Sequence, residues 1–402
     1  MRILKPLALL LSIILLSSCM ATSKKEKISQ VEKQLLYAEK QLSLLLVDAE
    51  KANKIPRTLD EHGQMHFTHN NFDWTEGFYP GSSWYLYEAT GDVKWKNAAE
   101  KFQSLFEEHK NRTTNHDLGF VFNCSYGNGY RLTKNEAFKE VMITAGNSLL
   151  TRFNPNVGCI KSWDVDNGWQ ATRGWEFPVI IDNMMNLELL FELSKLTGDM
   201  KYQEVAIAHA DTTLKNHFRS DNSSYHVIDY DAETGAVRNK HTAQGFAHES
   251  SWARGQAWGI YGYTVCYRYT KNVKYLNQAV KIADYILNYK GMPTDGIPYW
   301  DYNAANIPNE PRDVSAATVT VAALIELDGY TETSYLPEID KILRSLATEE
   351  YTAKLGKNKN FLLKHSVGSI PHNNEIDVPL NYADYYYLEA LLKYEDSYSP
   401  KN

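Results

Sequence analysis

The sequence predicts an all-α protein whose helices pair into a closed ring of six hairpins, an (α/α)6 toroid. Apolar residues recur at spacings of three and four from about residue 27 onward, as in VSAATVTVAALIEL over residues 314–327, whereas strand-like alternation is scarce. A short motif typical of a joint between helices returns several times. No linker rich in Pro, Gly or Ser interrupts the chain. These observations favour one domain over residues 30–398.

The recurring motif predicts where one helix ends and the next begins. It combines a threonine, a Gly or Asn turn and an aromatic residue early in the following helix. Because the copies are irregularly spaced, they do not fit a regular solenoid, but they fit hairpins joined by long functional loops. The copies are TGDVKW from Thr90, TKNEAF from Thr133, TGDMKY from Thr197 and TKNVKY from Thr270.

The N-terminus predicts export. Residues 1–18 combine a short basic start with an apolar run that is too short for a membrane span, and Leu16-Ser17-Ser18-Cys19 resembles a bacterial lipobox. We therefore expect a lipoprotein signal peptide over 1–18, lipid on Cys19, and a polar tether over 19–29 that holds the protein at a membrane. An ordinary secretory signal is the alternative. The expected location is periplasmic or associated with the outer membrane.

Composition narrows the class of ligand. The net charge of −7 argues against nucleic acid as a partner. The 27 tyrosines and nine tryptophans suit sugar rings, which stack on flat apolar faces. Cys124, Cys159 and Cys266 have no CxxC spacing, so they indicate neither a disulfide framework nor a zinc site. The histidines at 62, 66 and 69 lack an HExxH pattern, and we expect no metal and no organic cofactor.

Four polar segments are poorly explained by packing. Asp182 interrupts the apolar run FPVIIDNMMNLELLFEL, where an unpaired buried carboxylate would cost several kcal/mol. The helical pattern continues across it, which weakens a capping role. Asp117 precedes Leu-Gly-Phe and either caps a helix or works chemically. Trp74 lies in an aromatic turn. Arg254 and Trp258, four residues apart, share a helix face suited to a carboxylate and a sugar ring, although ordinary salt bridging by Arg254 is an alternative.

Several motifs, in order along nearly the whole mature chain, resemble the unsaturated glucuronyl hydrolases of glycoside hydrolase family 88. They are DWTEGFYPGSSWYLYE, HDLGF, IIDNMMNLELL, TAQGFAHESSWARGQAWGIYGY, PYWDYNAANIPNEPRDVSAA and DVPLNYADYYYLEALL. The resemblance implies the same six-hairpin toroid, in which residues 30–398 form a single catalytic domain. It also implies a reaction on the unsaturated uronic acid that polysaccharide lyases leave at the non-reducing end of their products.

The resemblance also assigns residues. It places Asp182 at the general acid and base and Asp117 at the second essential aspartate. In HSVGSIPHNNEID, Ser366 and Ser369 match serines of members that prefer sulfated substrates, but Pro371 stands where the lysine would be. A preference for sulfate is therefore in doubt. The positions that it implies for contact with the sugar are Trp74, His226, Thr242, Gln244, Arg254 and Trp258.

The implied chemistry is hydration of a vinyl ether. One carboxyl group, Asp182, protonates C4 of the substrate and then takes a proton from the attacking water. Its apolar neighbours Ile180, Ile181 and Met184 should raise its pKa, while Asp117 is expected to stay ionised in a more polar setting. A rhamnogalacturonyl hydrolase of the related family 105 and a non-catalytic glycan-binding lipoprotein are the alternatives.

Overall fold

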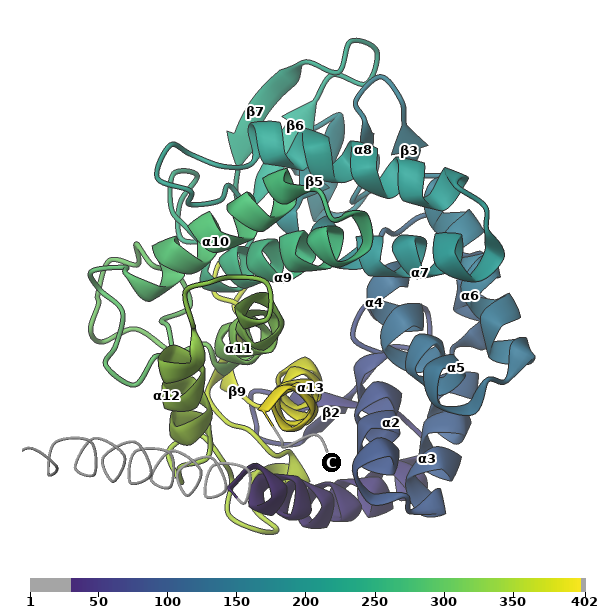
Figure 1. Ribbon diagram of the computed structural model, residues 1–402, viewed down its shortest axis with the longest axis vertical. Helices are drawn as coiled ribbons and strands as arrows, with labels where there is room; N and C mark the ends of the chain where they lie inside the picture. Colours follow the sequence, from purple (N-terminus) through teal and green to yellow (C-terminus); the bar gives the residue numbers. More distant parts are fainter. Residues whose placement is uncertain (1–29, 399–402) are drawn as a thin grey trace, which may run out of the picture.

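The computed structural model describes residues 30–398, and these form a closed double ring of helices (Figure 1). The predicted signal peptide, the tether and Cys19 lie outside the described residues. Within them, an inner ring of helices is surrounded by an outer ring, which confirms the predicted (α/α)6 toroid. The inner helices are α2 (Phe78–Thr90), α4 (Leu118–Phe122) with its continuation α5 (Asn128–Thr133), α7 (Leu187–Thr197), α9 (Ala253–Thr270), α11 (Val314–Asp328) and α13 (Asn381–Tyr398).

The outer ring alternates with the inner one along the chain. A π-helical turn, η2 (Asn123–Gly127), joins α4 to α5, and short 3-10 helices occupy four connections. The outer helices are the helix over residues 30–52, α3 (Val93–Ser104), α6 (Glu136–Leu150), α8 (Lys201–Asn216), α10 (Val273–Leu287) and α12 (Leu336–Leu346), and the 3-10 helices are η1 (Glu107–Asn111), η3 (Trp169–Arg173), η4 (Ile181–Asn186) and η5 (Asn358–Asn360).

The two rings differ in how their helices bury side chains. Helix α11 is apolar on all sides and nearly all of its residues are buried, because it lies between neighbouring inner helices and the outer ring. Helix α12 buries only one face, which includes Ile339, Ile342 and Leu346. The core is therefore the layer between the rings together with the contacts among inner helices.

The recurring threonine motif forms the same joint each time. The hydroxyl of Thr90 donates to the carbonyl of Leu86, 2.7 Å away, and accepts from the N–H of Asp92. The Asp92 carboxylate then caps α3 by accepting from the N–H of Lys94. The joints at Thr133, Thr197 and Thr270 repeat this pattern. These joints link inner to outer helices at one end of the ring, so the long loops gather at the other end.

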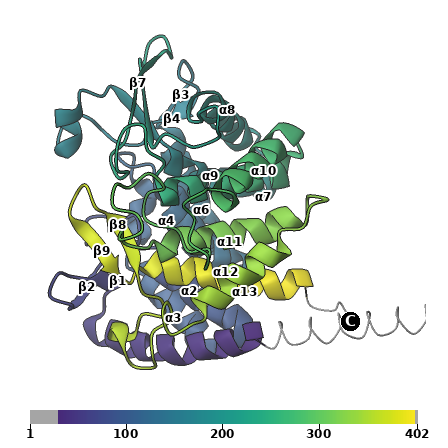
Figure 2. The ribbon, with the colours of Figure 1, turned by 90° about the vertical axis from the view of Figure 1, so that its left-hand side faces the viewer.

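Short strands lie at the long-loop end of the ring, and Figure 2 labels several of them. Their pairing is antiparallel, and only β5, β6 and β7 form a three-stranded sheet. The strands are β1 (Pro56–Leu59), β2 (Met65–Phe67), β3 (Phe153–Asn154), β4 (Cys159–Ile160), β5 (Phe177–Ile180), β6 (Val227–Tyr230), β7 (Val237–His241), β8 (Ser366–Ser369) and β9 (Asn374–Val378).

The structure corrects the expected helix through Asp182. Residues Phe177–Ile180 form strand β5, Asp182 lies in the 3-10 helix η4, and the α-helix begins only at Leu187. The β-branched Val179 and Ile180 suit a strand, and Pro178 is tolerated because β5 is an edge strand of its sheet. Strand β6 pairs with β5 from Phe177 to Ile180. The apolar run is therefore a strand, a turn and a helix in succession.

Candidate active site

Asp182 lies at the long-loop end of the ring and is almost completely buried, with 8% of its surface exposed. Helix η4 carries it between strand β5 and helix α7. Burial raises the pKa of Asp182 to about 7, although the positive charge of Arg254 and the indole of Trp258 oppose this rise. The prediction that apolar surroundings raise this pKa is confirmed.

Asp117 shares the site with Asp182. It occupies the N-cap position of α4, but its side chain makes no capping hydrogen bond, so capping does not explain it. Burial and the nearby charge of Asp182 raise the pKa of Asp117 well above its ordinary value. The expected polar setting of Asp117 is therefore wrong, because its carboxyl group is buried and its pKa is raised. Two carboxyl groups in one buried place resist ionising together, so the pair retains a proton.

His226 faces Asp182 with its Nε2 atom, 3.6 Å from Oδ2 of the carboxyl group. Its Nδ1 atom accepts from the backbone N–H groups of Ala243 and Gln244, at 3.0 and 3.1 Å. Burial also lowers the pKa of His226 well below its ordinary value. The ring is therefore neutral, and because Nδ1 is an acceptor, the proton lies on Nε2 and points toward the site.

An amide network fixes Asp117 relative to Asp182. The carboxamide of Asn186 accepts from the N–H of Phe120 and donates to Asn183, which in turn donates to the carbonyl of Ile160. His116 lies beside this network, with Nε2 3.3 Å from Oδ1 of Asp117 and its pKa lowered by burial to about 3. The sequence did not single out His116 or Asn186; for Asn186 the available signal was the recurrence of polar residues within the apolar run.

Arg254 is fully buried at the start of α9 and already has partners. It pairs with Asp313, 3.0 Å away, and donates to the backbone carbonyls of Val367 and Gly368 in β8. Salt bridging, the alternative left open by the sequence, thus accounts for part of its role. The same contacts bring the β8–β9 hairpin to the site, where Gln244 also reaches the carbonyl of Gly368 at 3.4 Å.

The remaining residues predicted to contact the sugar differ in their burial and in their partners. Trp258 has no exposed surface, packs on Phe120 and Tyr386, and places its indole against Asp182. Trp74 is only half-buried and packs on Phe120 and Tyr382 at the inner wall. The hydroxyl of Thr242 accepts from the N–H of Gly245.

The predicted serines line the β8–β9 side of the site. Ser366 is fully buried in β8 and its hydroxyl has no partner, whereas Ser369 forms a 2.7 Å hydrogen bond with His372. Three tryptophans from the loop before β5 cover the opposite side. Trp163 stacks on Trp175 and meets His226 edge-on, and Trp169 contacts His372 of the β8–β9 hairpin.

Buried polar atoms without hydrogen-bond partners converge at this place. Such atoms are costly when nothing satisfies them, and they cluster where a ligand supplies the missing bonds. The set here includes both donors and acceptors, as a polyhydroxylated ligand requires. It comprises Oδ2 of Asp182, Nε2 of His116 and His226, Nε of Arg254, the indole nitrogen of Trp252, and the hydroxyls of Ser366 and Tyr382.

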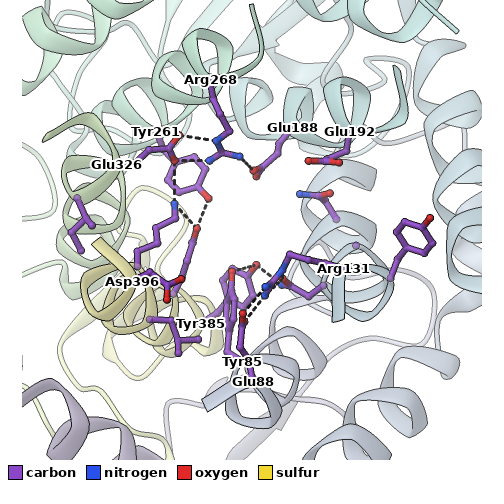
Figure 3. A pocket seen from close by; sticks show the side chains of 18 of the residues that line it. Tyr85, Glu88, Arg131, Glu188, Glu192, Tyr261, Arg268, Glu326, Tyr385 and Asp396 are labelled. Atoms are coloured by element: carbon purple, nitrogen blue, oxygen red, sulfur yellow. Dashed lines mark hydrogen bonds and ion pairs between the residues drawn. The ribbon is translucent and has the colours of Figure 1, made fainter. Parts of the chain in front are cut away.

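A cavity of about 610 Å³ opens at the opposite end of the ring, near the C-terminal ends of the inner helices (Figure 3). Its charges neutralise one another: Arg268 pairs with Glu188 and Glu326, and Arg131 pairs with Glu88. It contains neither Asp182 nor Asp117. In residues 30–398 we find no group of three or more His, Cys, Asp or Glu side chains placed to hold a metal ion. No helix in this part of the chain is long and apolar enough to cross a membrane.

Comparison with known proteins agrees with this geometry. An unsaturated glucuronyl hydrolase of Formosa agariphila is 43% identical over 97% of this chain and 98% of its own length. An unsaturated chondroitin disaccharide hydrolase of Streptococcus agalactiae is 35% identical over 81% of this chain and 82% of its own.

The same holds for solved structures. The crystal structure of an unsaturated glucuronyl hydrolase specific for heparin superposes with a TM-score of 0.85, at 43% identity, covering 91% of this chain and 97% of that one. The model of Glycosyl Hydrolase Family 88 matches residues 49–397. The chain therefore belongs to Glycosyl Hydrolase Family 88 and is a glycosidase.

Proposed function

We propose that this enzyme hydrates the C4=C5 double bond of the unsaturated uronic acid at the non-reducing end of lyase-produced oligosaccharides, with Asp182 as general acid and base. The observation that carries the proposal is the convergence of unpartnered buried polar atoms on Asp182, whose pKa is raised to about 7. The names of the relatives, which act on unsaturated glucuronyl and chondroitin disaccharide substrates, support the substrate class.

The substrate is a vinyl ether, because its double bond is conjugated to the ring oxygen. Protonated Asp182 donates its proton to C4, which leaves an oxocarbenium-like cation at C5. Water adds to C5 and gives its proton to the Asp182 carboxylate, which restores the acid. The hemiketal that results opens and expels the rest of the oligosaccharide. No bond to C1 is attacked directly, so the carboxylate separation rule for ordinary glycosidases does not apply.

The neighbours of Asp182 suit this sequence. When Asp182 gives up its proton, the coupled pair with Asp117 gains negative charge beside the new cation, which stabilises the cation by charge attraction at short range. His226, neutral and protonated on Nε2, supplies a donor to a substrate oxygen next to Asp182. The N-terminal ends of the inner helices point to this end of the ring and favour the anionic uronate.

The test is the Asp182→Asn variant. It keeps the shape of the side chain but cannot transfer a proton, so we expect at least a 10³-fold loss of kcat on an unsaturated disaccharide. Turnover is measured as the fall in ultraviolet absorbance when the double bond is lost. Binding of the same disaccharide should persist within about tenfold, measured by calorimetry. Turnover near the wild-type rate by this variant would remove Asp182 from the mechanism.

We propose no sulfate preference from the β8–β9 hairpin alone. Ser366 and Ser369 line the site, but Pro371 offers no positive charge there. A panel of heparin, chondroitin and rhamnogalacturonan disaccharides, with and without sulfate, ranks the substrates by kcat/KM. A strong preference for the rhamnogalacturonan product would contradict the glucuronyl assignment.

We also propose that the protein is exported as a lipoprotein anchored through Cys19. The support is the basic start, the short apolar run and Leu16-Ser17-Ser18-Cys19. In the native host, the mature wild-type protein should begin at Cys19 and carry the mass of attached lipid, and the Cys19→Ala variant should not. An unmodified N-terminus in the wild-type protein would contradict the anchor.

A further inference from the structure

The outer surface of the helix over residues 30–52 carries a single stripe of lysines and aliphatic side chains. Successive members are three or four residues apart, so they fall on one face of the helix. The last member, Lys54, lies two residues beyond the end of the helix. Leu36 and Val47, two members of this stripe, are 54% and 62% exposed. The stripe consists of Lys33, Leu36, Lys40, Leu44, Val47, Lys51 and Lys54.

A neighbouring loop extends this stripe. The buried side chain of Gln41 donates to the carbonyls of Lys357 and Phe361 and accepts from the N–H of Gly356. These bonds fasten the loop against the helix, where Gly356 lies next to Leu44 and the adjacent Leu355 is 53% exposed. The stripe and the loop residues Leu355, Lys357 and Lys359 together are termed the basic flank.

The charge of the basic flank is not cancelled locally. The side chains of Lys33, Lys40, Lys51 and Lys54 form no ion pair and no hydrogen bond within residues 30–398. Acidic residues follow both borders of the stripe: Glu32 and Glu50 lie on one side, and Asp48, which accepts a hydrogen bond from Asn360 of the loop, lies on the other. The lysines of the flank outnumber them. The flank is thus positively charged on a chain whose net charge is −7.

We propose that the basic flank rests on an anionic lipid surface. Protein interfaces are poor in lysine and rich in aromatic residues and arginine, whereas this flank has lysines and aliphatic side chains only. Lysines around aliphatic groups are the pattern that binds the charged headgroup layer of a bilayer while the aliphatic groups enter its boundary. The inference rests on the export and anchoring proposed above.

The position of the flank in the chain supports the same occupant. The described part of the helix that carries the flank begins at Gln30, and Cys19 precedes Gln30 by eleven residues. Fully extended, this segment spans at most about 40 Å, so a lipid on Cys19 would keep the helix near the bilayer. The segment itself contains Lys24, Lys25 and Lys27, which add positive charge beside the flank.

The orientation that follows keeps the active site accessible. The helix over residues 30–52 forms part of the outer wall of the ring, drawn in purple in Figure 1. In Figure 2 it runs along the lower edge, while the strand-bearing end with the site faces sideways. With the basic flank on a membrane, the strand-bearing end that carries the site faces along the membrane surface and stays accessible to soluble oligosaccharides.

The test measures binding of the full chain to lipid vesicles in the Cys19→Ala background, which lacks the lipid. One variant carries Lys33→Gln, Lys40→Gln, Lys51→Gln and Lys54→Gln. The matched control carries the same change at four exposed lysines elsewhere, Lys195→Gln, Lys215→Gln, Lys281→Gln and Lys290→Gln. Vesicles are phosphatidylcholine alone or phosphatidylcholine with phosphatidylglycerol, and activity on a soluble disaccharide confirms that each protein is folded.

We expect the flank variant to lose roughly tenfold or more of its affinity for the anionic vesicles, while the control keeps its affinity and high salt weakens both. Leu36→Gln with Val47→Gln should also weaken binding. Equal binding by the flank and control variants would overturn the proposal. So would loss of retention on a heparin column without loss on vesicles, because the occupant would then be a polysaccharide. A failure of Cys19 lipidation appears separately, in the mass of the native protein.

Discussion

Asp182 sits where two physical effects oppose each other. Burial favours its protonated form, and the charge of Arg254 favours its ionised form; burial is the larger effect, so the pKa rises to about 7. The hydration reaction needs that protonated form at the start. A residue whose pKa stayed at its ordinary value would be ionised at neutral pH and could not protonate C4.

The pH dependence of activity follows from this shift. Asp182 is protonated below about pH 7 and ionised above it, so kcat/KM should decline as the pH rises through 7. The profile measured on an uncharged chromogenic leaving group should show the same limb. Activity that rises steadily from pH 6 to pH 9 would mean that another group is the acid.

The same shift predicts a stability effect. A carboxyl group whose folded pKa is raised stabilises the fold at low pH, and this contribution is lost as the pH rises toward the folded pKa. Asp182→Asn removes the cost of the buried charge, so it should be more stable than the wild type at pH 8, by on the order of 2 kcal/mol. The difference in Tm between the two should shrink toward pH 4. An Asp182→Asn protein that is less stable at pH 8 would contradict the assigned cause.

At the scale of elements, the site depends on how closely η4 approaches helix α9. A Cβ atom on Gly262 would lie 2.5 Å from Cβ of Met184, two residues after Asp182. A Cβ atom on Gly259, one turn earlier on the same helix, would make only ordinary contacts with Ile282 and Phe218. Gly262 therefore lets η4 lie against α9, and Gly259 does not share that role.

The two glycines form a matched pair for a test. Gly262→Ala should displace η4 and cost about 2 kcal/mol of unfolding free energy together with a tenfold or larger loss of kcat. Gly259→Ala should be neutral or slightly stabilising, because alanine favours the helix. Chemical denaturation and kinetics on one disaccharide measure both. Equal behaviour of the two variants would show that the approach of η4 to α9 is not what positions Asp182.

For the whole molecule, charged pairs at the cavity end join inner helices that are distant in sequence. Arg268 of α9 pairs with Glu188 of α7 and Glu326 of α11, and Lys393 of α13 also pairs with Glu326. The Arg268 charge lowers the pKa of Glu326 to about 2 despite its burial. These pairs hold the ring closed at the end opposite the site.

Removing Arg268 should therefore weaken the ring and spare the chemistry. Arg268→Ala leaves Glu188 without its ion pair and Glu326 with Lys393 alone, and should cost about 2 kcal/mol, less than the loss of a fully buried pair because the Arg268 side chain is 27% exposed. Arg131→Ala, whose pair with Glu88 is more exposed, should cost well under 1 kcal/mol. KM and kcat at 25 °C should be unchanged in both. A large change in kcat for Arg268→Ala would mean that the two ends of the ring are coupled.

The sequence by itself determined the ring and its joints. Periodicity of three and four sets the helices, and the threonine motif fixes each joint through bonds between residues at most four apart, which depend only on local order. The resemblance of the motifs to glycoside hydrolase family 88 also identified Asp117 and Asp182 as candidate catalytic residues. By contrast, the periodicity wrongly predicted that helix α7 extends back through the residues of β5, because a buried strand and a buried helix are both continuous apolar runs.

Only the tertiary structure decided the state and surroundings of these residues. The partners of Asp182, His226 and Arg254 come from segments far away in the sequence, such as β8 for Arg254. The pKa of Asp117 depends on its burial and on Asp182, which no local pattern encodes. Burial and charge pairing are sums over neighbours in space, so the chemistry of the site was settled when the ring closed and brought those neighbours together.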